Sequence, residues 1–398
     1  MPHPAPSPND GPGPWLVLAL AIASGVTVAN IYYAQPLIGP ISQSFGLSLS
    51  AAGLIVTMLQ LGYMLGLIFL APLGDLIENK RLILITLGGV AVSLLMSVAA
   101  PNAALFIAAS LLLGFTAVGT QMIVPVAANL SPDHKRGQIV GTVMSGLLFG
   151  ILLARPLSTL IAGELGWRGM YLISAAAMAV VIVLMAVALP RRRPRQSLGY
   201  WQLIGSLGRL LLSTPVLQRR AAYQALLFAD FSLFWTSSPL LLQAPPLSLG
   251  HIALSAFLLS GVAGAFIAPL AGRLADHGHS RALTGAAMAA VALSFVLMGL
   301  GGAGSLAAMV VAGIVLDAGT QANLVAGQRA IYALPAEFRS RLNALFLALL
   351  FFGGALGSAL SGFAVSLGGA TLVSAIGFSI ALIALLLFAT EFRRRSAK

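Results

Sequence analysis

The sequence contains no cysteine, and only 8% of its 398 residues are charged. The absence of cysteine excludes a disulfide framework, a metal–thiolate site and a cysteine nucleophile. The shortage of charge excludes an ordinary water-soluble globule, in which about a quarter of the residues are charged. Hydrophobic residues make up 59% of the chain, and the mean hydropathy is +0.97. These values place the chain in a lipid bilayer.

The apolar residues gather into twelve stretches, each close to the roughly 20 residues that a helix needs to cross a bilayer. The predicted spans are residues 15–36, 50–71, 82–100, 103–127, 138–162, 169–189, 218–240, 251–271, 282–300, 305–328, 342–366 and 371–390. Histidines occur only in the tail, the loops and the span ends, and no span carries two acids at helical spacing. We therefore predict an all-α integral membrane protein that needs no cofactor and no metal, and we do not expect an embedded enzyme.

The formal net charge of +12 is distributed unevenly along the chain. If the N-terminus is cytoplasmic, 20 of the 22 lysines and arginines fall in cytoplasmic loops or tails, and only Arg155 and Arg168 do not. This asymmetry follows the positive-inside rule and predicts that both termini are cytoplasmic. The basic excess thus reports topology and does not indicate nucleic-acid binding. Removal of the first apolar stretch as a signal peptide would invert the pattern, so we expect that stretch to be a retained helix.

A basic interval near the middle of the chain separates six spans from six. We expect a tail at 1–14, a six-helix bundle at 15–189, a cytoplasmic linker at 190–217, a second six-helix bundle at 218–390 and a basic tail at 391–398. Within the linker, residues 200–212 alternate apolar and polar positions. They are expected to form either an amphipathic helix on the inner leaflet or a flexible connection.

The two halves of the chain repeat one another weakly. Gly119-Thr120-Gln121 in the fourth span and Gly319-Thr320-Gln321 in the tenth are offset by 200 residues. Ala71-Pro72-Leu73 and Ala268-Pro269-Leu270 likewise close the second and eighth spans. Internal repeats in a protein with many spans are typical of transporters, in which the substrate pathway lies at the interface between the repeats.

These features resemble the twelve-span major facilitator superfamily and, within it, the bacterial proton-driven efflux permeases of the drug and sugar type. The resemblance rests partly on a degenerate motif after the second span, Ala71-Pro72-Leu73-Gly74-Asp75 followed by Lys80 and Arg81, and on a second copy, residues 272–278, after the eighth. It implies that acids at helix ends pair with basic residues across a cytoplasmic cleft, whereas the alternative is a set of solvated loop charges. The predicted cytoplasmic gate residues are Asp75, Lys80, Arg81, Arg136, Arg273, Asp276, Arg281 and Arg339.

A ridge of small residues runs along the fifth span and includes Gly146, Gly150, Ala154 and Ser158 at four-residue spacing. It is similar to the antiporter motif of the family, although Ala154-Arg155-Pro156 stands where that motif has Gly-Pro. The eleventh span repeats the ridge at Gly353, Gly357 and Ser361. Close packing of two helix backbones would explain both ridges equally well.

Three charges are expected inside the bilayer, where an uncompensated charge is costly and is normally functional. Asp230 and Asp317 are the predicted proton-coupling residues, with Asp317 preferred. Arg155 lies 17 residues from the inner end of its span, on the order of 25 Å along a helix axis. It is expected either to extend outward to the lipid headgroups or to face a central cavity.

The resemblance implies that the first, fourth, seventh and tenth spans line a central cavity. The predicted substrate-binding residues, which include neighbours from the second and fifth spans, are Asn30, Tyr32, Tyr33, Gln60, Tyr63, Gln121, Arg155, Phe234 and Gln321. Hydrogen bonding between helices is the alternative explanation for the polar members of this set.

We therefore predict a secondary active transporter of the bacterial inner membrane that works as a monomer. It would export a small organic solute, such as a drug, sugar or metabolite, in exchange for protons by alternating access. An uptake symporter or uniporter with the same fold is the main alternative. A receptor is disfavoured because no substantial soluble domain is present, and a channel suits the duplicated halves less well.

Overall fold

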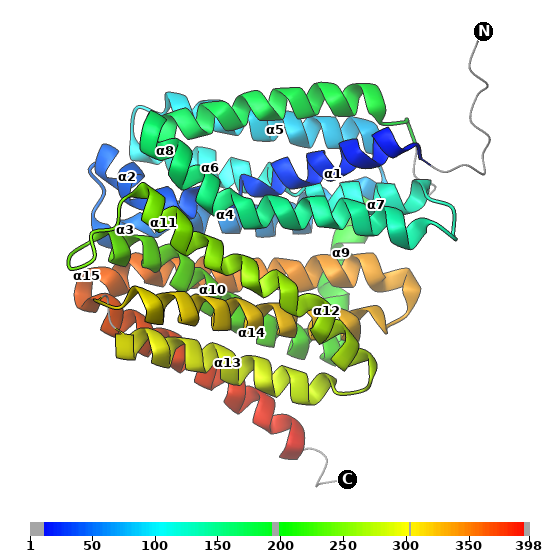
Figure 1. Ribbon diagram of the computed structural model, residues 1–398. Helices are drawn as coiled ribbons and strands as arrows, with labels where there is room; N and C mark the ends of the chain where they lie inside the picture. Colours follow the sequence, from blue (N-terminus) through cyan, green and yellow to red (C-terminus); the bar gives the residue numbers. More distant parts are fainter. Residues whose placement is uncertain (1–11, 193–198, 302–303, 394–398) are drawn as a thin grey trace.

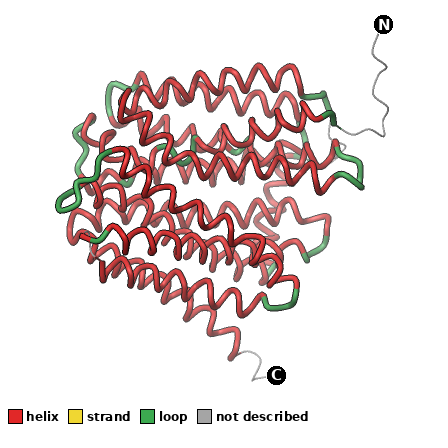
Figure 2. Tube along the Cα trace, viewed as in Figure 1, coloured by secondary structure: helices red, strands yellow, loops and turns green. Residues whose placement is uncertain are grey.

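The computed structural model describes residues 12–192, 199–301 and 304–393, and this part of the chain is helical with no strand (Figures 1 and 2). The first half contains α1 (Pro14–Ala29), α2 (Ala34–Ser44), α3 (Leu49–Ala52), α4 (Leu54–Leu65), η1 (Gly66–Leu70), η2 (Ala71–Asp75), α5 (Asn79–Ala99), α6 (Ala103–Ala117), α7 (Thr120–Leu130) and α8 (Arg136–Ala188). After α9 (Tyr200–Ser213), the second half contains α10 (Pro215–Gln243), α11 (His251–Leu258), η3 (Leu259–Val262), α12 (Ala263–Asp276), α13 (Ser280–Gly301), α14 (Leu306–Tyr332), η5 (Ala336–Phe338) and α15 (Arg339–Arg393). We call α1–α8 the N-terminal half and α10–α15 the C-terminal half.

The helices account for the twelve predicted spans. Nine helical segments of the described chain are long and apolar enough to cross a membrane, and α1 and α2 form a tenth span with a bend of 41°. The 53-residue α8 and the 55-residue α15 each contain two spans, which meet at Gly166 (φ 72°) and Gly369 (φ 55°). Such positive φ angles suit glycine, which has no Cβ, so the chain reverses at these two residues. The prediction of an all-α protein with twelve spans is confirmed.

The small-residue ridges pack helix backbones against one another within each half. In the N-terminal half, Gly146 and Gly150 of α8 lie against the backbone of α1, and Gly150 contacts Gly25. In the C-terminal half, Gly353 and Gly357 of α15 lie in the same way against α10. A Cβ atom at any of these four glycines would collide with a backbone oxygen, so close packing is a role that the structure assigns to both ridges.

The two halves form two stacked layers, with α9 at the same end of the molecule as the start of α1 (Figure 1). The linker helix α9 bridges the halves, because Tyr200 donates a hydrogen bond to the Phe69 carbonyl (2.9 Å) and Ser206 accepts one from Arg341 (3.0 Å). Within α9, the side chains of Leu203 and Leu207 are buried, whereas that of Trp201 is 76% exposed. Of the two expectations for residues 200–212, the helix is therefore the one observed.

Parts of the predicted tails and linker, residues 1–11, 193–198 and 394–398, lie outside the described residues. At the C-terminal end, α15 continues three residues beyond the predicted end of its last span, and Glu391 is buried there with only 9% of its surface exposed. The residue thus belongs to the packed helix and not to the basic tail to which the sequence assigned it.

Candidate functional site

Arg155 lies in the middle of the interface between the two halves. Only 4% of its surface is exposed, and its Nε donates a hydrogen bond of 2.7 Å to Oε1 of Gln35. The guanidinium carbon lies 5.2 Å from the ring centre of Tyr32, 5.0 Å from that of Phe231 and 4.7 Å from that of Trp235. Aromatic faces attract a cation at such distances. Arg155 therefore does not extend to the headgroups but faces the C-terminal half.

Asp317 joins this group from α14. Its Oδ1 accepts a hydrogen bond of 2.7 Å from the indole Nε1 of Trp235, and 7% of its surface is exposed. Arg155 and Asp317 interact electrostatically, although no ion pair within 4.0 Å joins them in the described chain. We call Tyr32, Gln35, Arg155, Phe231, Trp235 and Asp317 the central cluster; it brings together one cation and one acid from opposite halves.

Two donors of the central cluster have no hydrogen-bond partner in the described protein. They are Nη2 of Arg155 and the amide Nε2 of Gln35, and both atoms are buried. A buried donor without a partner costs about 1–3 kcal/mol. Because Arg155 and Gln35 are hydrogen-bonded to each other, the two free donors belong to directly neighbouring side chains.

Asp230, the second predicted proton-coupling residue, lies in a different environment. Its side chain is 0% exposed, and neither carboxyl oxygen has a hydrogen-bond partner among the described residues. It is sealed inside the protein, whereas Asp317 retains slight exposure and a donor, Trp235.

A second polar group crosses the interface beside the central cluster. Gln60 of α4 donates a hydrogen bond of 2.9 Å to Ser232 of α10 and accepts a long one of 3.5 Å from Ser358 of α15. Tyr63 accepts a hydrogen bond of 3.1 Å from Gln121, and its ring centre lies 4.3 Å from that of Phe351 in the C-terminal half. Three predicted substrate-binding residues, Gln60, Tyr63 and Gln121, thus lie together at or beside the interface.

Other predicted substrate-binding residues lie elsewhere. Asn30 faces α8, where its Oδ1 accepts a hydrogen bond of 2.6 Å from Ser174, and Phe234 is fully buried near Phe257 and Phe295 within the C-terminal half. Tyr33 and Gln321 are half-buried; they follow Tyr32 directly and Asp317 by one helical turn, respectively.

The sequence reasoning did not select three members of the central cluster: Gln35, Phe231 and Trp235. Gln35 stands in the conspicuously polar end of the first span, and the two aromatics flank Phe234, which was selected in their place. The polarity of the first span was a usable signal for Gln35. The choice between neighbouring aromatics on one helix requires the rotation of that helix, which its sequence does not specify.

The predicted cytoplasmic gate residues do not converge on one site. Asp75 interacts electrostatically with Arg341, a residue of the C-terminal half that the sequence reasoning missed. Asp276 pairs with Arg329 at 3.2 Å inside the C-terminal half, and Arg136 pairs with its neighbour Asp133 at 2.6 Å. The remaining predicted gate residues lie in other places: Lys80 and Arg81 line a surface cavity, Arg273 and Arg339 are exposed, and Arg281 contacts Glu391.

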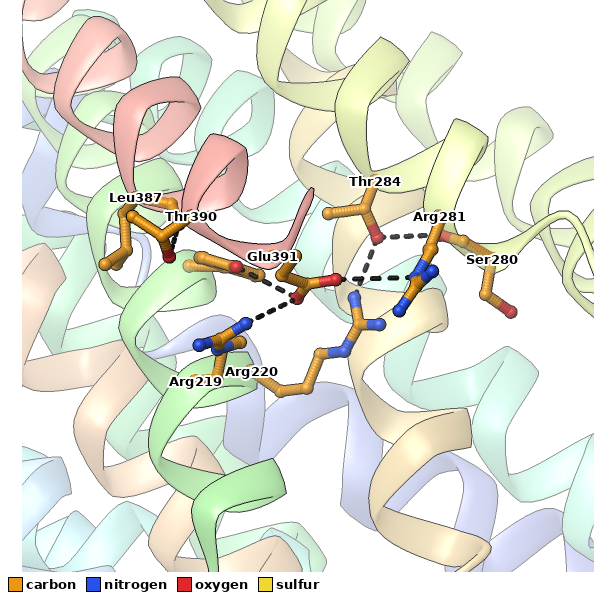
Figure 3. Close-up of polar contacts among 9 residues, drawn as sticks. Arg219, Arg220, Ser280, Arg281, Thr284, Leu387, Thr390 and Glu391 are labelled. Atoms are coloured by element: carbon orange, nitrogen blue, oxygen red, sulfur yellow. Dashed lines mark hydrogen bonds and ion pairs between the residues drawn. The ribbon is translucent and has the colours of Figure 1, made fainter. Parts of the chain in front are cut away.

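Glu391 organises the best-connected charge cluster of the C-terminal half (Figure 3). Its carboxylate accepts a hydrogen bond of 3.0 Å from Tyr223 and lies 3.7 Å from Arg219 and 3.6 Å from Arg281. Arg220 donates to Thr284 beside it, at 2.8 Å. The cluster joins the starts of α10 and α13 to the end of α15 and therefore holds one half together rather than linking the two.

Comparison with known proteins agrees with this architecture. The pattern of the Major Facilitator Superfamily matches residues 20–217. The chain is 39% identical over 380 residues to the putative uncharacterized transporter YgaY of Escherichia coli (strain K12), an alignment that covers 94% of this chain and 95% of YgaY. It is 34% identical over 349 residues to the probable transporter SCO4007 of Streptomyces coelicolor, covering 86% and 79% of the two chains.

A solved structure shares the fold: a bacterial homolog of the human lysosomal transporter Spinster, in an inward-facing and occupied conformation. The TM-score is 0.78 at 14% sequence identity, and 98% of each chain is covered. The chain therefore belongs to the Major Facilitator Superfamily and is a multi-pass transporter of the bacterial inner membrane.

Proposed function

We propose that this transporter exports a small organic solute in exchange for protons by alternating access, and that Asp317 binds and releases the proton. The observation that carries the proposal is the position of Asp317 in the central cluster, where it interacts with Arg155 from the opposite half. An acid at the interface of two moving halves can be exposed to each side of the membrane in turn.

The central cluster supplies a physical link between protonation and movement. Ionised Asp317 offsets the charge of Arg155, and the attraction acts between α8 and α14, which belong to different halves. This attraction is strong because the surroundings have a low dielectric constant. Protonation of Asp317 removes it and shifts the equilibrium between the two arrangements of the halves.

Contacts that would have to open on the outer side support the same mechanism. Ser255 of α11 donates a hydrogen bond of 3.0 Å to the Pro156 carbonyl, His251 lies against Gly163, and Ser358 lies against Gly53. Each contact joins the two halves at the end away from α9. Release to the outside requires these contacts to separate while the end that carries α9 closes.

The test uses purified protein in proteoliposomes with an internal pH dye and a panel of drugs, sugars and metabolites. A substrate is a compound that moves protons in the wild type. Asp317→Asn should then abolish proton-driven transport while substrate exchange is partly retained. Asp133→Asn, at a loop acid that is 90% exposed, is the matched control and should behave as the wild type. Wild-type rates in Asp317→Asn under an imposed pH gradient would refute the role of Asp317.

Uptake by symport is a second candidate, favoured by the two free donors of Arg155 and Gln35. An anionic substrate bound there would be repelled by ionised Asp317 and would bind more tightly after Asp317 is protonated. Proton and substrate would then travel together. A substrate that binds the Asp317 carboxylate would instead compete with the proton, which produces exchange. Adding substrate outside the vesicles should make the lumen alkaline in exchange and acidic in symport, so the sign of the dye signal decides.

A further inference from the structure

Three basic residues lie together on the side of the N-terminal half that faces away from the C-terminal half and from the central cluster. Lys80, Arg81 and Arg191 line a cavity of about 550 Å³, together with Glu78, Leu84 and Ile85. Arg81 and Arg191 are exposed and Lys80 is half-buried. No ion pair in the described part of the chain uses any of the three. With Glu78 counted, the cavity has a net charge of +2 (three cations minus one acid).

An apolar surface leads away from this cavity along two packed helices. On α5, Ile85 and Val92 are exposed; they follow Arg81 by four and eleven residues, which places the three residues on one helix face. On α8, Val180 and the 81% exposed Val187 are seven residues apart and lie on one helix face, and Arg191 follows shortly after the end of α8 at Ala188. The two helices pack together at the side of the N-terminal half that is farthest from the C-terminal half (Figure 1). Exposed apolar side chains in these spans contact lipid chains.

We propose that this cavity binds the headgroup of an anionic phospholipid of the inner leaflet, with its acyl chains lying along α5 and the second part of α8. The three cations would surround the phosphate, and the exposed isoleucine and valines would contact the chains. Charge complementarity selects the occupant: a cavity with net charge +2 attracts an anionic headgroup and gives a zwitterionic one little advantage. The inference assigns Lys80 and Arg81 to lipid binding and does not depend on the transport mechanism.

Native mass spectrometry of the detergent-purified full chain can test the inference by titration with phosphatidylglycerol and with phosphatidylcholine of identical acyl chains. The wild type should retain phosphatidylglycerol and bind phosphatidylcholine much more weakly. The double variant Lys80→Gln/Arg191→Gln should bind phosphatidylglycerol about 30-fold more weakly, because each cation near the membrane surface contributes about 1 kcal/mol. Lys135→Gln/Arg209→Gln removes the same charges from exposed positions elsewhere and should bind as the wild type does.

Melting temperatures in lipid-free detergent check that the variants fold. If the double variant does not fold, Arg81→Gln alone replaces it and should weaken binding about fivefold. Equal retention of phosphatidylglycerol by wild type and variant, or equal binding of the two lipids, would overturn the proposal. Displacement of the lipid by millimolar inorganic phosphate would also overturn it, because the site would then recognise a free anion.

Discussion

The two halves place different residues at one corresponding position, Asn30 directly after α1 and Asp230 in α10. The offset of 200 residues is the one that relates Gly119-Thr120-Gln121 to Gly319-Thr320-Gln321. In the N-terminal half, the amide of Asn30 donates to the Val26 carbonyl (2.8 Å) and accepts from Ser174 (2.6 Å). In the C-terminal half, both oxygens of Asp230 lack hydrogen-bond partners among the described residues. An asparagine can serve as donor and acceptor at this position, whereas a carboxylate has only acceptors.

This difference shows that the two halves share the same helix packing but differ in their buried charged residues. Glycines hold α1 against α8 and α10 against α15 in the same manner. Among the described residues, the buried cation, Arg155, belongs to the N-terminal half, whereas the buried acids Asp230, Asp317 and Glu391 belong to the C-terminal half. Of these acids, Asp317 interacts with the cation of the other half. The interface between unlike halves is therefore the place where a buried cation of one half and a buried acid of the other interact.

Asn30→Asp is expected to have the largest effect on stability. It places a carboxylate beside the carbonyls of Val26 and Thr27, with Ser174 as its single donor among the hydrogen bonds described. An uncompensated buried charge costs about 3–5 kcal/mol. Unfolding by sodium dodecyl sulfate titration in mixed micelles measures the loss. Asn30→Ser is the uncharged control. If Asn30→Asp lost no more free energy of unfolding than this control, position 30 would tolerate a carboxylate as position 230 does, and the contrast between the two positions would fail.

The glycine contacts should respond alike in the two halves. Gly150→Val and Gly353→Val each push a side chain into a backbone oxygen of the facing helix, at Gly25 and Ala225 respectively, two positions that are also 200 residues apart. We expect each to lower the free energy of unfolding by about 3 kcal/mol or more, because overpacking forces the helices apart. Gly141→Val, at a glycine with open space around it, is the control. A large effect in one half alone would break the equivalence of the two packing contacts.

Asp230→Asn is expected to stabilise the protein. An amide at this position can donate to the carbonyls of Leu226 and Leu227, as Asn30 does to those of Val26 and Thr27. The gain should be about 1–2 kcal/mol for two hydrogen bonds. The same detergent titration measures it, and proteoliposome assays should show that proton-driven transport is retained. If Asp230→Asn lost proton-driven transport and Asp317→Asn kept it, Asp230 and not Asp317 would be the residue that binds the proton.

The smallest effects concern the ion pairs at the end of the molecule that carries α9. Glu391→Gln removes the pairs with Arg219 and Arg281, whose shared carboxylate is 9% exposed, and should cost about 1 kcal/mol. Asp133→Asn removes the pair with Arg136, in which the two side chains are 90% and 51% exposed, and should change stability by less than about 0.5 kcal/mol. Raising the salt concentration should reduce the second effect more than the first. Equal losses of unfolding free energy in Glu391→Gln and Asp133→Asn would show that burial of the carboxylate does not strengthen its ion pairs.

Sequence patterns predicted the architecture because hydrophobic length and charge asymmetry are local quantities. The twelve spans and the two helical ridges could be read from residue spacing, whereas residues 200–212 were compatible with either a helix or a flexible connection. The candidate site was predictable only as a set of polar positions in apolar surroundings, such as Arg155, Asp317 and Gln60. Trp235 was passed over for Phe234, and Arg341 for Arg339, because residues one or two positions apart on a helix point in different directions and only the packing selects one.

The sequence by itself determined that this chain crosses a membrane twelve times, that its halves are related, and that a few charges must lie in hydrocarbon. Each segment fulfils these conditions on its own, because its length of apolar residues and the basic residues beside it are local properties of the sequence. Only the tertiary structure decided which charges meet: Arg155 turns inward to three aromatic rings, Asp317 joins it through Trp235, and Asp230 finds no hydrogen-bond partner in the part of the chain that the structure describes. The reason is geometric, since these contacts depend on how helices from different parts of the chain rotate and pack against one another.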